Sequence, residues 1–555
     1  MNAHDPVPSI WTTGTSEVFK TGTWRTALPR HIQAPSPCHA ACPVNGDIAE
    51  WIGHAHAGDL RGAWEILTRH NPFPAIAGRI CHHPCEVACN RSGYDASVAI
   101  CRLERHVGDA ALAAGWSFTA GATPRVERIA IVGAGPSGLS AAFHLRRRGY
   151  AVTLFESSPE LGGVMRRGIP GYRLPRSVLD GEIARIVALG VDVRCGESIA
   201  TAAEFGRLRA GFDAVYIATG ACRQKRLPQI DYRQAWVMDG ADYLAQANAG
   251  MPPVLGKRIA VIGGGSAAID VARSARRAGH DVTIVVLEAV SQMPAQAGEV
   301  VEALEEGITI LNGAMLVTAG GAGQSGVALN CIHVHCEPGA ARGQWTVTPL
   351  AGTEFTLDTD AVITAIGQDP ELGPFLEMLA SGDGLLLTDR RQATNAARVY
   401  AGGDVASMAR FVTEAIGMGK RAAQAIHAAL GSDAQGAAHG MDRDAEAIVA
   451  PGSINTFYHP KQARVPDQRV PASVRLDGDA EVHIGLDVER ALAEAARCFS
   501  CGTCTQCDNC VRYCPDLAVE RTAGGYIVLT DYCKGCGLCV RECPTGSMRM
   551  VEEAR

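Results

Sequence analysis

Two stretches of the chain repeat one succession of an apolar run, a glycine-rich turn and a segment with helical spacing of its apolar residues. Residues 129–132 and 259–262 are wholly apolar, which is typical of strands buried on both faces of a parallel sheet. Glycines follow each run at once, so the chain turns there and enters a helix. The pattern therefore predicts two parallel α/β units in one chain.

Other segments complete this outline. Apolar residues at three-to-four spacing predict helices at 48–66, 139–148, 412–429 and 488–497. A further apolar run at 151–155 predicts the second strand of the first α/β unit. Residues 433–496 are rich in Ala, Gly, Asp and Pro, and we interpret them as a linker that crosses back over the body of the protein.

Composition narrows the class of protein. A chain of 555 residues with 47% hydrophobic and 20% charged residues has room for about three to five globular domains. The net charge of −7 argues against a nucleic-acid partner, and no apolar run approaches the ~18 residues of a membrane span. The first residues lack the pattern of a signal peptide. Because most of the 20 cysteines stand in ligand-like clusters, we expect the reducing cytoplasm.

The C-terminal cysteines follow one spacing twice, C-x2-C-x2-C-x3-C-P. This doubled run is the signature of bacterial ferredoxins, in which the fourth cysteine of each run ligates the other 4Fe–4S cluster. One cluster is then expected on Cys504, Cys507, Cys510 and Cys543, and the other on Cys533, Cys536, Cys539 and Cys514. Zinc ribbons and disulfides are the alternatives, but zinc sites use pairs of C-x2-C rather than triplets.

A second group of cysteines lies near the N-terminus, at Cys38, Cys42, Cys81, Cys85, Cys89 and Cys101. The phrases CPVNGDI, NPFPAIAGRICHHPCEVAC and SVAICRLERHV resemble the N-terminal iron–sulfur domain of the glutamate synthase small subunit and of dihydropyrimidine dehydrogenase. The resemblance implies two 4Fe–4S clusters in this segment. The remaining isolated cysteines are interpreted as buried thiols: Cys195, Cys222, Cys331 and Cys336.

The resembling family also has an R-C-x2-C-G phrase before its first cysteines, and this chain has that phrase only at residues 497–502. We infer that the pair has moved to the other end of the chain. One N-terminal cluster would then take Cys38, Cys89, Cys498 and Cys501. The other would take Cys42, Cys81 and Cys85 with either Glu104, by family position, or Cys101, the better thiolate donor. The alternative is a single N-terminal cluster, with Cys498 and Cys501 as spare thiols.

The first glycine turn has the fingerprint of a dinucleotide site. Gly133 makes the turn, Gly135 lets the backbone approach a pyrophosphate, and Gly138 lets the helix pack on the strand. Glu156 ends the next strand and can accept hydrogen bonds from ribose hydroxyls. Pro136 and Ser137 complete the turn.

The resemblance assigns FAD to this first unit. The segments that match are the loop around Gly163, the phrase at Thr219 and Gly220, and the phrase at Gly403 and Asp404. In the resembling flavoproteins this Asp bonds the ribityl–pyrophosphate region. The helix at 412–429 is then expected behind the flavin, where Gly417 and Gly419 allow close approach.

The second turn comprises Gly263, Gly265, Ser266, Ala267 and Ala268, with Ala268 in place of the third glycine. NADPH-dependent members of the resembling family end the following strand with paired arginines, whereas this chain has Leu287 and Glu288. Because a carboxylate accepts from a 2′-hydroxyl and repels a 2′-phosphate, we predict NAD(H) over NADP(H). A solvated strand end is the alternative for Glu288.

These parts predict a multidomain α/β fold. We expect a helical iron–sulfur domain (1–124), an FAD domain (125–249 and 371–432), an inserted NAD domain (250–370), the linker (433–496) and an α+β ferredoxin domain (497–555). A flavin joins two-electron nicotinamide chemistry to one-electron iron–sulfur chemistry. The predicted function is therefore electron transfer between NAD(H), FAD, 4Fe–4S clusters and a partner redox enzyme.

The partner class expected from the ferredoxin module is a 2-oxoacid:acceptor oxidoreductase or a related anaerobic complex, with a free ferredoxin as a further acceptor. Two alternatives remain. In the first alternative, the chain is a glutamate synthase small subunit that delivers electrons to a large glutamate-forming subunit. The C-terminal ferredoxin runs and Glu288 both argue against this alternative. Otherwise it is a binding or scaffold protein whose sites have decayed, which the complete glycine motifs oppose.

Overall fold

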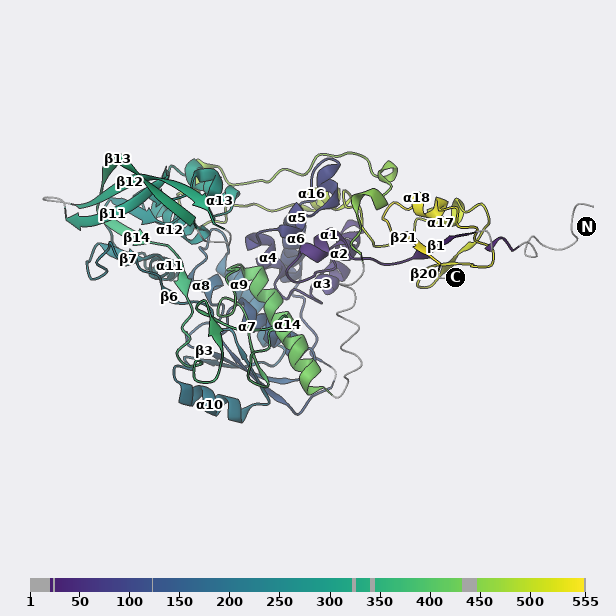
Figure 1. Cartoon of the computed structure of the whole chain (residues 1–555), viewed down its shortest axis with the longest axis horizontal. Helices are drawn as coiled ribbons and strands as arrows, with labels where there is room; N and C mark the ends of the chain where they lie inside the picture. The colour runs from purple at the N-terminus through teal and green to yellow at the C-terminus, as the bar shows by residue number, and fades with distance from the viewer. Residues whose placement is uncertain are drawn as a thin grey trace, which may run out of the picture.

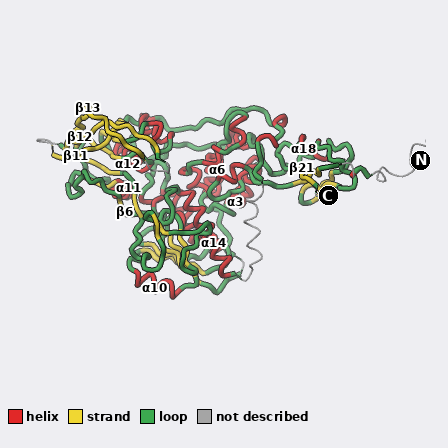
Figure 2. The backbone as a smooth tube through the Cα atoms, in the orientation of Figure 1, coloured by secondary structure: helices red, strands yellow, loops and turns green. Residues whose placement is uncertain are grey.

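The computed structural model describes residues 20–22, 25–121, 123–321, 326–339, 345–431 and 447–553. The N-terminal segment considered for a signal peptide and the first part of the expected linker lie outside these residues. Figure 1 shows a central helical part with one α/β unit below it, a second α/β unit at upper left and a small C-terminal domain at right. Strands gather in these outer parts and helices in the middle (Figure 2). No helix in the described ranges is both long and apolar enough to cross a membrane.

The FAD unit is built on a five-stranded parallel sheet. Its order is β18 (Val399–Ala401), β5 (Ala214–Ile217), β2 (Arg128–Val132), β3 (Ala151–Glu156) and β4 (Asp192–Cys195). Both expected strands are therefore present. Helices α7 (Pro136–Arg146) and α14 (Val412–Leu430) pack together closely, because a Cβ atom on Gly419 would lie 2.2 Å from the Ser137 carbonyl oxygen. The other helices of the unit are α8 (Val164–Arg167), α9 (Arg176–Val187) and α10 (Ala202–Gly211).

The NAD unit repeats this design. Its parallel sheet has the order β10 (Thr309–Asn312), β9 (Asp281–Val286), β8 (Arg258–Ile262), β14 (Ala361–Thr364) and β7 (Val237–Asp239). Its helices are α11 (Gly240–Asn248), α12 (Ser266–Arg277) and α13 (Ala297–Glu305). A three-stranded antiparallel sheet covers it, formed by β11 (Ala314–Gly321), β12 (Val327–Pro338) and β13 (Trp345–Thr359).

The boundary between the two units differs from the expected one at residue 250. Strand β7 pairs with β14, so β7 and the helix α11 that follows belong to the NAD unit. The short β7 segment carries no glycine motif and therefore gave no sequence signal of its own. The chain crosses between the units through the antiparallel pair β6 (Arg223–Gln224) and β15 (Gln368–Asp369).

The helical domain contains two helices where one continuous segment was expected. Helix α2 (Ile48–His56) ends before Gly58, whose φ of +78° breaks the pattern, and Asp59 caps α3 (Leu60–Leu67). Further helices are α1 (Pro37–Ala41), α4 (Pro74–Ile80), α5 (Pro84–Val87) and α6 (Ile100–Ala113). Trp51 and Trp64 are buried at the centre of this domain.

The C-terminal domain includes a strand from the other end of the chain. Strand β1 (Ala27–His31), expected in the helical domain, pairs antiparallel with β21 (Met548–Glu552). The rest of the domain is the hairpin β19 (Val519–Thr522) and β20 (Gly525–Val528) with helices α17 (Asn509–Arg512) and α18 (Leu538–Arg541).

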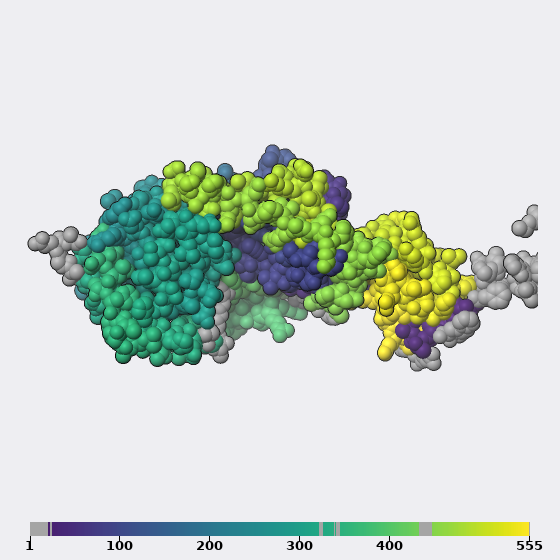
Figure 3. Space-filling view, turned by 90° about the horizontal axis from the view of Figure 1, so that it is seen from above, coloured from purple at the N-terminus to yellow at the C-terminus, as the bar shows by residue number. Residues whose placement is uncertain are grey.

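The segment 447–487, which we call the strap, lies across the NAD unit and the helical domain (Figure 3). It contains the short helix α15 (Ala472–Arg475) and leads into α16 (Val488–Ala495). On one side Arg475 donates to Glu305 of α13 at 2.8 Å, and on the other Arg464 donates to Glu86 of α5 at 2.7 Å. Helix α16 buries Ala491 and Ala495 in the core of the helical domain rather than acting as a linker.

Candidate functional site

The first glycine turn leaves room for a ligand at the start of α7. Gly133 has a φ of +104°, and a Cβ atom there would lie 2.3 Å from the Ala218 carbonyl oxygen. A Cβ atom on Gly138 would lie 1.9 Å from the Gly133 carbonyl oxygen, so this position requires glycine. At Gly135 no atom lies within 4 Å of the Cβ position. Because Pro136 begins α7, this open space faces a helix N-terminus, which favours a pyrophosphate.

Glu156 holds this turn from the end of β3. Its Oε2 accepts from the backbone N–H of Ala134 at 2.8 Å, and its Oε1 accepts from that of Ser158 at 2.8 Å. The carboxylate is 7% exposed and lies beside the glycine turn, as a ribose-binding acid requires. Its contact with a ribose stays a prediction.

The other residues assigned to FAD converge on the same turn. A Cβ atom on Gly163, at φ +54°, would lie 2.9 Å from the Cα of Gly135. A Cβ atom on Gly403, at φ +76°, would lie 3.2 Å from the Cβ of Ser137, whose hydroxyl pairs with that of Tyr216 at 2.6 Å. The Thr219 hydroxyl, next to Gly220, is buried and has no hydrogen-bond partner among the described residues. An open cradle beside an unpaired buried hydroxyl fits a bound dinucleotide.

Asp404 follows Gly403 and is partly buried. Burial raises the pKa of its carboxyl, and the guanidinium of Arg410, 3.9 Å away, acts in the opposite direction. Arg410 has a φ of +56°, and its Nε lacks a partner in the described part of the chain. Sequence reasoning missed this residue, because a single arginine before a helix carries no motif.

The second turn has the same construction. Gly263 has a φ of +136°, and a Cβ atom on it would lie 2.4 Å from the Ala365 carbonyl oxygen. The Cβ position of Gly265 is open, Ser266 begins α12 and Ala267 is exposed. Ala268 is wholly buried, so its methyl fits where the first turn needs glycine.

Glu288 is not a solvated strand end. Its side chain is 7% exposed, and its Oε2 lies 3.0 Å from the Cβ position of Gly264, in the second turn. Burial raises the pKa of this carboxyl. Sequence reasoning also missed the phrase at 364–367, where Thr364 ends β14 and Gly367 has a φ of +100°. The sequence signal that could have found this phrase is its similarity to residues 218–220, which follow β5 in the first unit.

The ferredoxin cysteines form two groups. One hollow is lined by Cys504, Cys507, Cys510 and Cys543. Burial, together with the neighbouring thiols of Cys504, Cys507 and Cys543, raises the pKa of Cys510 to about 12. Burial, together with the neighbouring thiols of Cys533, Cys514 and Cys536, likewise raises the pKa of Cys539 to about 12. Each group therefore combines three cysteines of one run with the fourth of the other.

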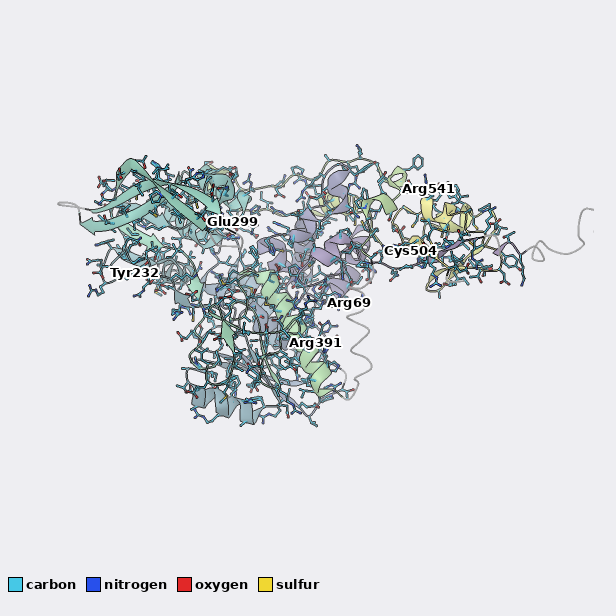
Figure 4. All side chains as sticks on the ribbon, viewed as in Figure 1. Arg69, Tyr232, Glu299, Arg391, Cys504 and Arg541 are labelled. Carbon is cyan, nitrogen blue, oxygen red and sulfur yellow. The ribbon has the colours of Figure 1, made fainter. Side chains whose placement is uncertain are left out.

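A third group joins the two ends of the chain. One hollow is lined by Cys38, Cys89, Cys498 and Cys501. Burial raises the pKa of Cys38, and Cys498, Cys501 and Cys89 raise it further. Arg497 holds the second pair in place, because its buried guanidinium donates to Glu494 at 2.5 Å and to the Ala96 carbonyl oxygen at 2.6 Å. Figure 4 shows Cys504, three residues after Cys501, on the side of the ferredoxin domain toward the helical domain.

The fourth group contains Cys42, Cys81 and Cys85. Burial raises the pKa of Cys42 to about 11 and that of Cys81 to about 12, and the Glu104 carboxylate is the next cause for both. Burial, Cys42, Cys81 and Glu104 also raise the pKa of Cys85. The Cys101 thiol donates instead to the Ala77 carbonyl oxygen at 3.6 Å. This arrangement favours Glu104 as the fourth member, and its role as a ligand stays a prediction.

No three or more His, Cys, Asp or Glu side chains in the described ranges are arranged to hold a single metal ion. A 4Fe–4S cube binds each thiolate at a separate iron, so its ligands stand farther apart than those of one ion. The two hollows that are lined by four thiols fit such a cube. Of the isolated cysteines, Cys331 is buried and Cys336 is partly buried. Cys195 and Cys222 are exposed, because Cys195 ends β4 and Cys222 lies in the loop before β6.

Three protein families match the chain. Pyridine nucleotide-disulphide oxidoreductase matches residues 127–429, dihydropyrimidine dehydrogenase domain II with its 4Fe–4S cluster matches 29–116, and the 4Fe–4S binding domain matches 526–549. These matches confirm the resemblance on which FAD, NAD(P) and 4Fe–4S clusters were predicted, and they confirm the fold class. The choice between NAD and NADP stays a prediction.

Curated relatives agree. The chain is 33% identical over 500 residues to the NADP(+)-dependent formate dehydrogenase subunit beta of Moorella thermoacetica, covering 84% of this chain and 70% of the relative. It is 32% identical over 396 residues to the NAD-dependent dihydropyrimidine dehydrogenase subunit PreT of Escherichia coli, covering 71% and 90%. It is 32% identical over 417 residues to the glutamate synthase [NADPH] small chain of Azospirillum brasilense, covering 70% and 86%.

The glycine turns, the cysteine groups and these similarities lead to one conclusion. The chain belongs to the pyridine nucleotide-disulphide oxidoreductase family, as an FAD- and NAD(P)-dependent oxidoreductase that carries 4Fe–4S domains toward both ends.

Proposed function

We propose that this chain is the electron-transfer subunit of a larger redox complex, passing electrons between NAD(H) and a partner enzyme through four 4Fe–4S clusters. When bound, a flavin exchanges two electrons with nicotinamide and single electrons with iron–sulfur clusters. The residues that would hold these groups are those of the two glycine turns and the four cysteine groups. The partner would dock near the ferredoxin domain, at the far end of the series.

The proposal rests mainly on one observation: each cysteine group is connected to the next by only three or four residues of the chain. Cys38 and Cys42 belong to different groups and stand one helical turn apart, about 6 Å along α1. Cys501 and Cys504 are three residues apart, so their Cα atoms are separated by at most about 11 Å. Cys510 and Cys514 are four residues apart, which limits them to about 14 Å. Such spans keep neighbouring groups within reach of electron transfer, which weakens steeply with distance.

The FAD site is also close to the nearest cysteine group, because α14 contacts both. The Cys81 thiol lies 3.6 Å from the Thr413 hydroxyl, in the first turn of α14. Lys420, on the same helix, donates to the Val44 carbonyl oxygen at 2.6 Å, two residues after Cys42. Helix α14 also packs on α7, which begins at the first glycine turn. These contacts support a direct path from the FAD site to the group of Cys42, Cys81 and Cys85.

The dinucleotide proposed is NAD(H), because Glu288 faces the second glycine turn where a 2′-phosphate needs positive charge. The partner proposed is a redox enzyme of an anaerobic complex in the cytoplasm, with a 2-oxoacid:acceptor oxidoreductase as the class suggested by the ferredoxin module. The relatives are named as subunits of a formate dehydrogenase, a dihydropyrimidine dehydrogenase and a glutamate synthase. Their names support a subunit role and leave the partner class open.

The first test is an anaerobic titration of the full chain with NADH and, separately, with NADPH. We expect NADH to bleach the flavin and then the clusters, whose paramagnetic resonance signals appear as they are reduced. A protein whose flavin is reduced by neither dinucleotide would overturn the proposal. Anaerobic purification from the native cells then identifies the partner.

A glutamate synthase small subunit is the second candidate, favoured by the 32% identity to that small chain. It predicts co-purification with a large glutamate-forming subunit. It also predicts that truncation after residue 503, which removes the ferredoxin runs, leaves electron delivery to that subunit unchanged.

A further inference from the structure

One turn of the FAD unit inserts its side chains into the NAD unit. It lies between α8 and α9, where the sequence resembled a flavin-side loop. Arg173 donates from Nη1 to Asp270 Oδ2 at 2.6 Å and from Nη2 to Glu299 Oε1. Asp270 belongs to α12 and Glu299 to α13, so the guanidinium joins one unit to two helices of the other. Figure 4 shows Glu299 at the edge of the NAD unit that faces the middle of the molecule.

Tyr172 strengthens the same contact. Its side chain is 1% exposed, and its hydroxyl donates to the Asp270 carbonyl oxygen at 3.4 Å. The guanidinium groups of Arg273 and Arg277 lie over its ring, 4.9 Å and 3.8 Å from the centroid. Aromatic rings hold cations in this geometry most strongly when both are shielded from water.

The ion pairs of Arg173 with Asp270 and Glu299 form only at one angle between the two units, because the partners lie on different units. The side chains of Arg173, Asp270 and Glu299 are 14%, 6% and 10% exposed, so one cation faces two carboxylates with little water. The second oxygen of each carboxylate has no hydrogen-bond partner in the described ranges. Separating such a group leaves buried charges unpaired, which costs more than an exposed ion pair would.

The position of this contact matters for the two dinucleotide sites. Asp270 lies five residues after Gly265, in the helix whose N-terminus faces the second turn. Arg173 lies ten residues after Gly163, whose backbone touches the first turn. The units are also joined by the short pair β6 and β15 and by an exposed hydrogen bond, in which Asn248 of α11 donates to the Arg167 carbonyl oxygen of α8 at 2.9 Å. Connections of this size allow bending between the units.

We propose that Arg173 is a positioning residue that fixes the angle between the two units and so aligns the nicotinamide with the flavin. This inference rests on the proposed function, since it concerns the same hydride transfer. The guanidinium of Arg173 contacts the carboxylates of Asp270 and Glu299. Its effect passes through Asp270 and Glu299 to the dinucleotide turn.

The test uses the full chain, loaded with FAD and clusters, carrying Arg173→Met. Because the substitution leaves the second turn itself unchanged, we expect the dissociation constant of NADH to stay within about twofold, while flavin reduction slows about tenfold or more. Small-angle X-ray scattering without any dinucleotide should show a broader distribution of distances. The matched control is Glu305→Gln, which removes a carboxylate from the same helix that pairs with the strap and not with the FAD unit.

If Arg173→Met does not fold because two carboxylates are left unpaired, the triple variant Arg173→Met, Asp270→Asn and Glu299→Gln removes those charges. We expect it to fold, bind NADH and reduce the flavin as slowly as described. Reduction at the wild-type rate by either variant, with an unchanged scattering curve, would overturn the inference. A wild-type protein that neither dinucleotide reduces would instead defeat the proposed function.

Discussion

The carbonyl oxygen of Pro43 lies 2.2 Å from the position that a Cβ atom would take on Gly417. The backbone after Cys42 therefore rests directly on α14, the helix expected behind the flavin. No larger residue than glycine fits at this crossing without moving one of the two segments. Gly417 thus allows the backbone of the iron–sulfur domain to pack directly against the backbone of the FAD unit.

Substitution Gly417→Ala is expected to destabilise this junction. The added methyl must displace backbone, which costs about 1–3 kcal/mol and lowers the midpoint of heat-induced flavin release by about 2–4 °C per kcal/mol. Gly53→Ala is the control, because Gly53 lies in α2 with no atom within 4 Å of its Cβ position. Alanine there should be neutral or stabilising. Equal midpoints for the two variants would contradict the crossing.

Changing Cys498 and Cys501 to Ser should remove one cluster. These thiols line the hollow that also contains Cys38 and Cys89, so their loss leaves two ligands where a cube needs four. We expect bound iron to fall by about four atoms per chain, while the ferredoxin signals persist. The measurement is iron content together with paramagnetic resonance of the reduced protein.

Cys195 and Cys222 provide the matched control for that experiment, since both are exposed and lie outside the four groups. Changing both to Ser should leave the iron content unchanged. If the Cys498 and Cys501 variant also kept all its iron, the two residues would be spare thiols and the helical domain would hold a single cluster.

Substitution also distinguishes between Glu104 and Cys101 as the fourth ligand of the group that contains Cys42, Cys81 and Cys85. Glu104→Ala removes the carboxylate that acts on Cys42, Cys81 and Cys85, so the cluster of this group should be lost or become unstable. Cys101→Ser keeps a donor toward the Ala77 carbonyl oxygen and should leave the cluster intact. The reverse pattern in iron content and resonance spectra would make Cys101 the ligand.

The sequence sufficed for the parts of the fold that repeat a local pattern. Both glycine turns, the strands before them and the pairing of the ferredoxin cysteines follow from spacing, because their geometry is set within a few residues. The place of Cys498 and Cys501 beside Cys38 and Cys89 could also be inferred, since a family phrase was missing at one end and surplus at the other. Their role as ligands stays a prediction. Gly58 was harder, because a single glycine inside an apolar pattern is compatible with a continuous helix.

Long-range contacts could not be predicted from spacing. Strand β1 pairs with β21 across almost the whole chain, and neither strand specifies its partner in its own residues. Helix α16 reads as the end of a linker until its alanines are seen in the core around Trp51. Arg173 lies in a loop assigned to the flavin, and only the structure shows that its guanidinium reaches the other unit.

Glu288 should decide the choice of dinucleotide. Its carboxylate lies beside Gly264 in the second turn, where the 2′-position of a bound dinucleotide is expected. Glu288→Gln removes the negative charge and keeps the size, so we expect the ratio of kcat/KM for NADPH over NADH to rise about tenfold, equivalent to about 1.4 kcal/mol. Steady-state kinetics with an artificial electron acceptor measures this ratio without a partner protein.

The double variant Leu287→Arg and Glu288→Arg should shift the preference further, because two guanidinium groups can bind a phosphate with paired hydrogen bonds. Glu156→Gln is the matched control: it is the corresponding acid of the first unit, 7% exposed like Glu288, and it faces the other turn. It should weaken FAD retention and leave the ratio between NADPH and NADH unchanged. An unchanged ratio in the double variant would show that Glu288 does not face the 2′-position, and the preference for NAD(H) would lose its physical basis.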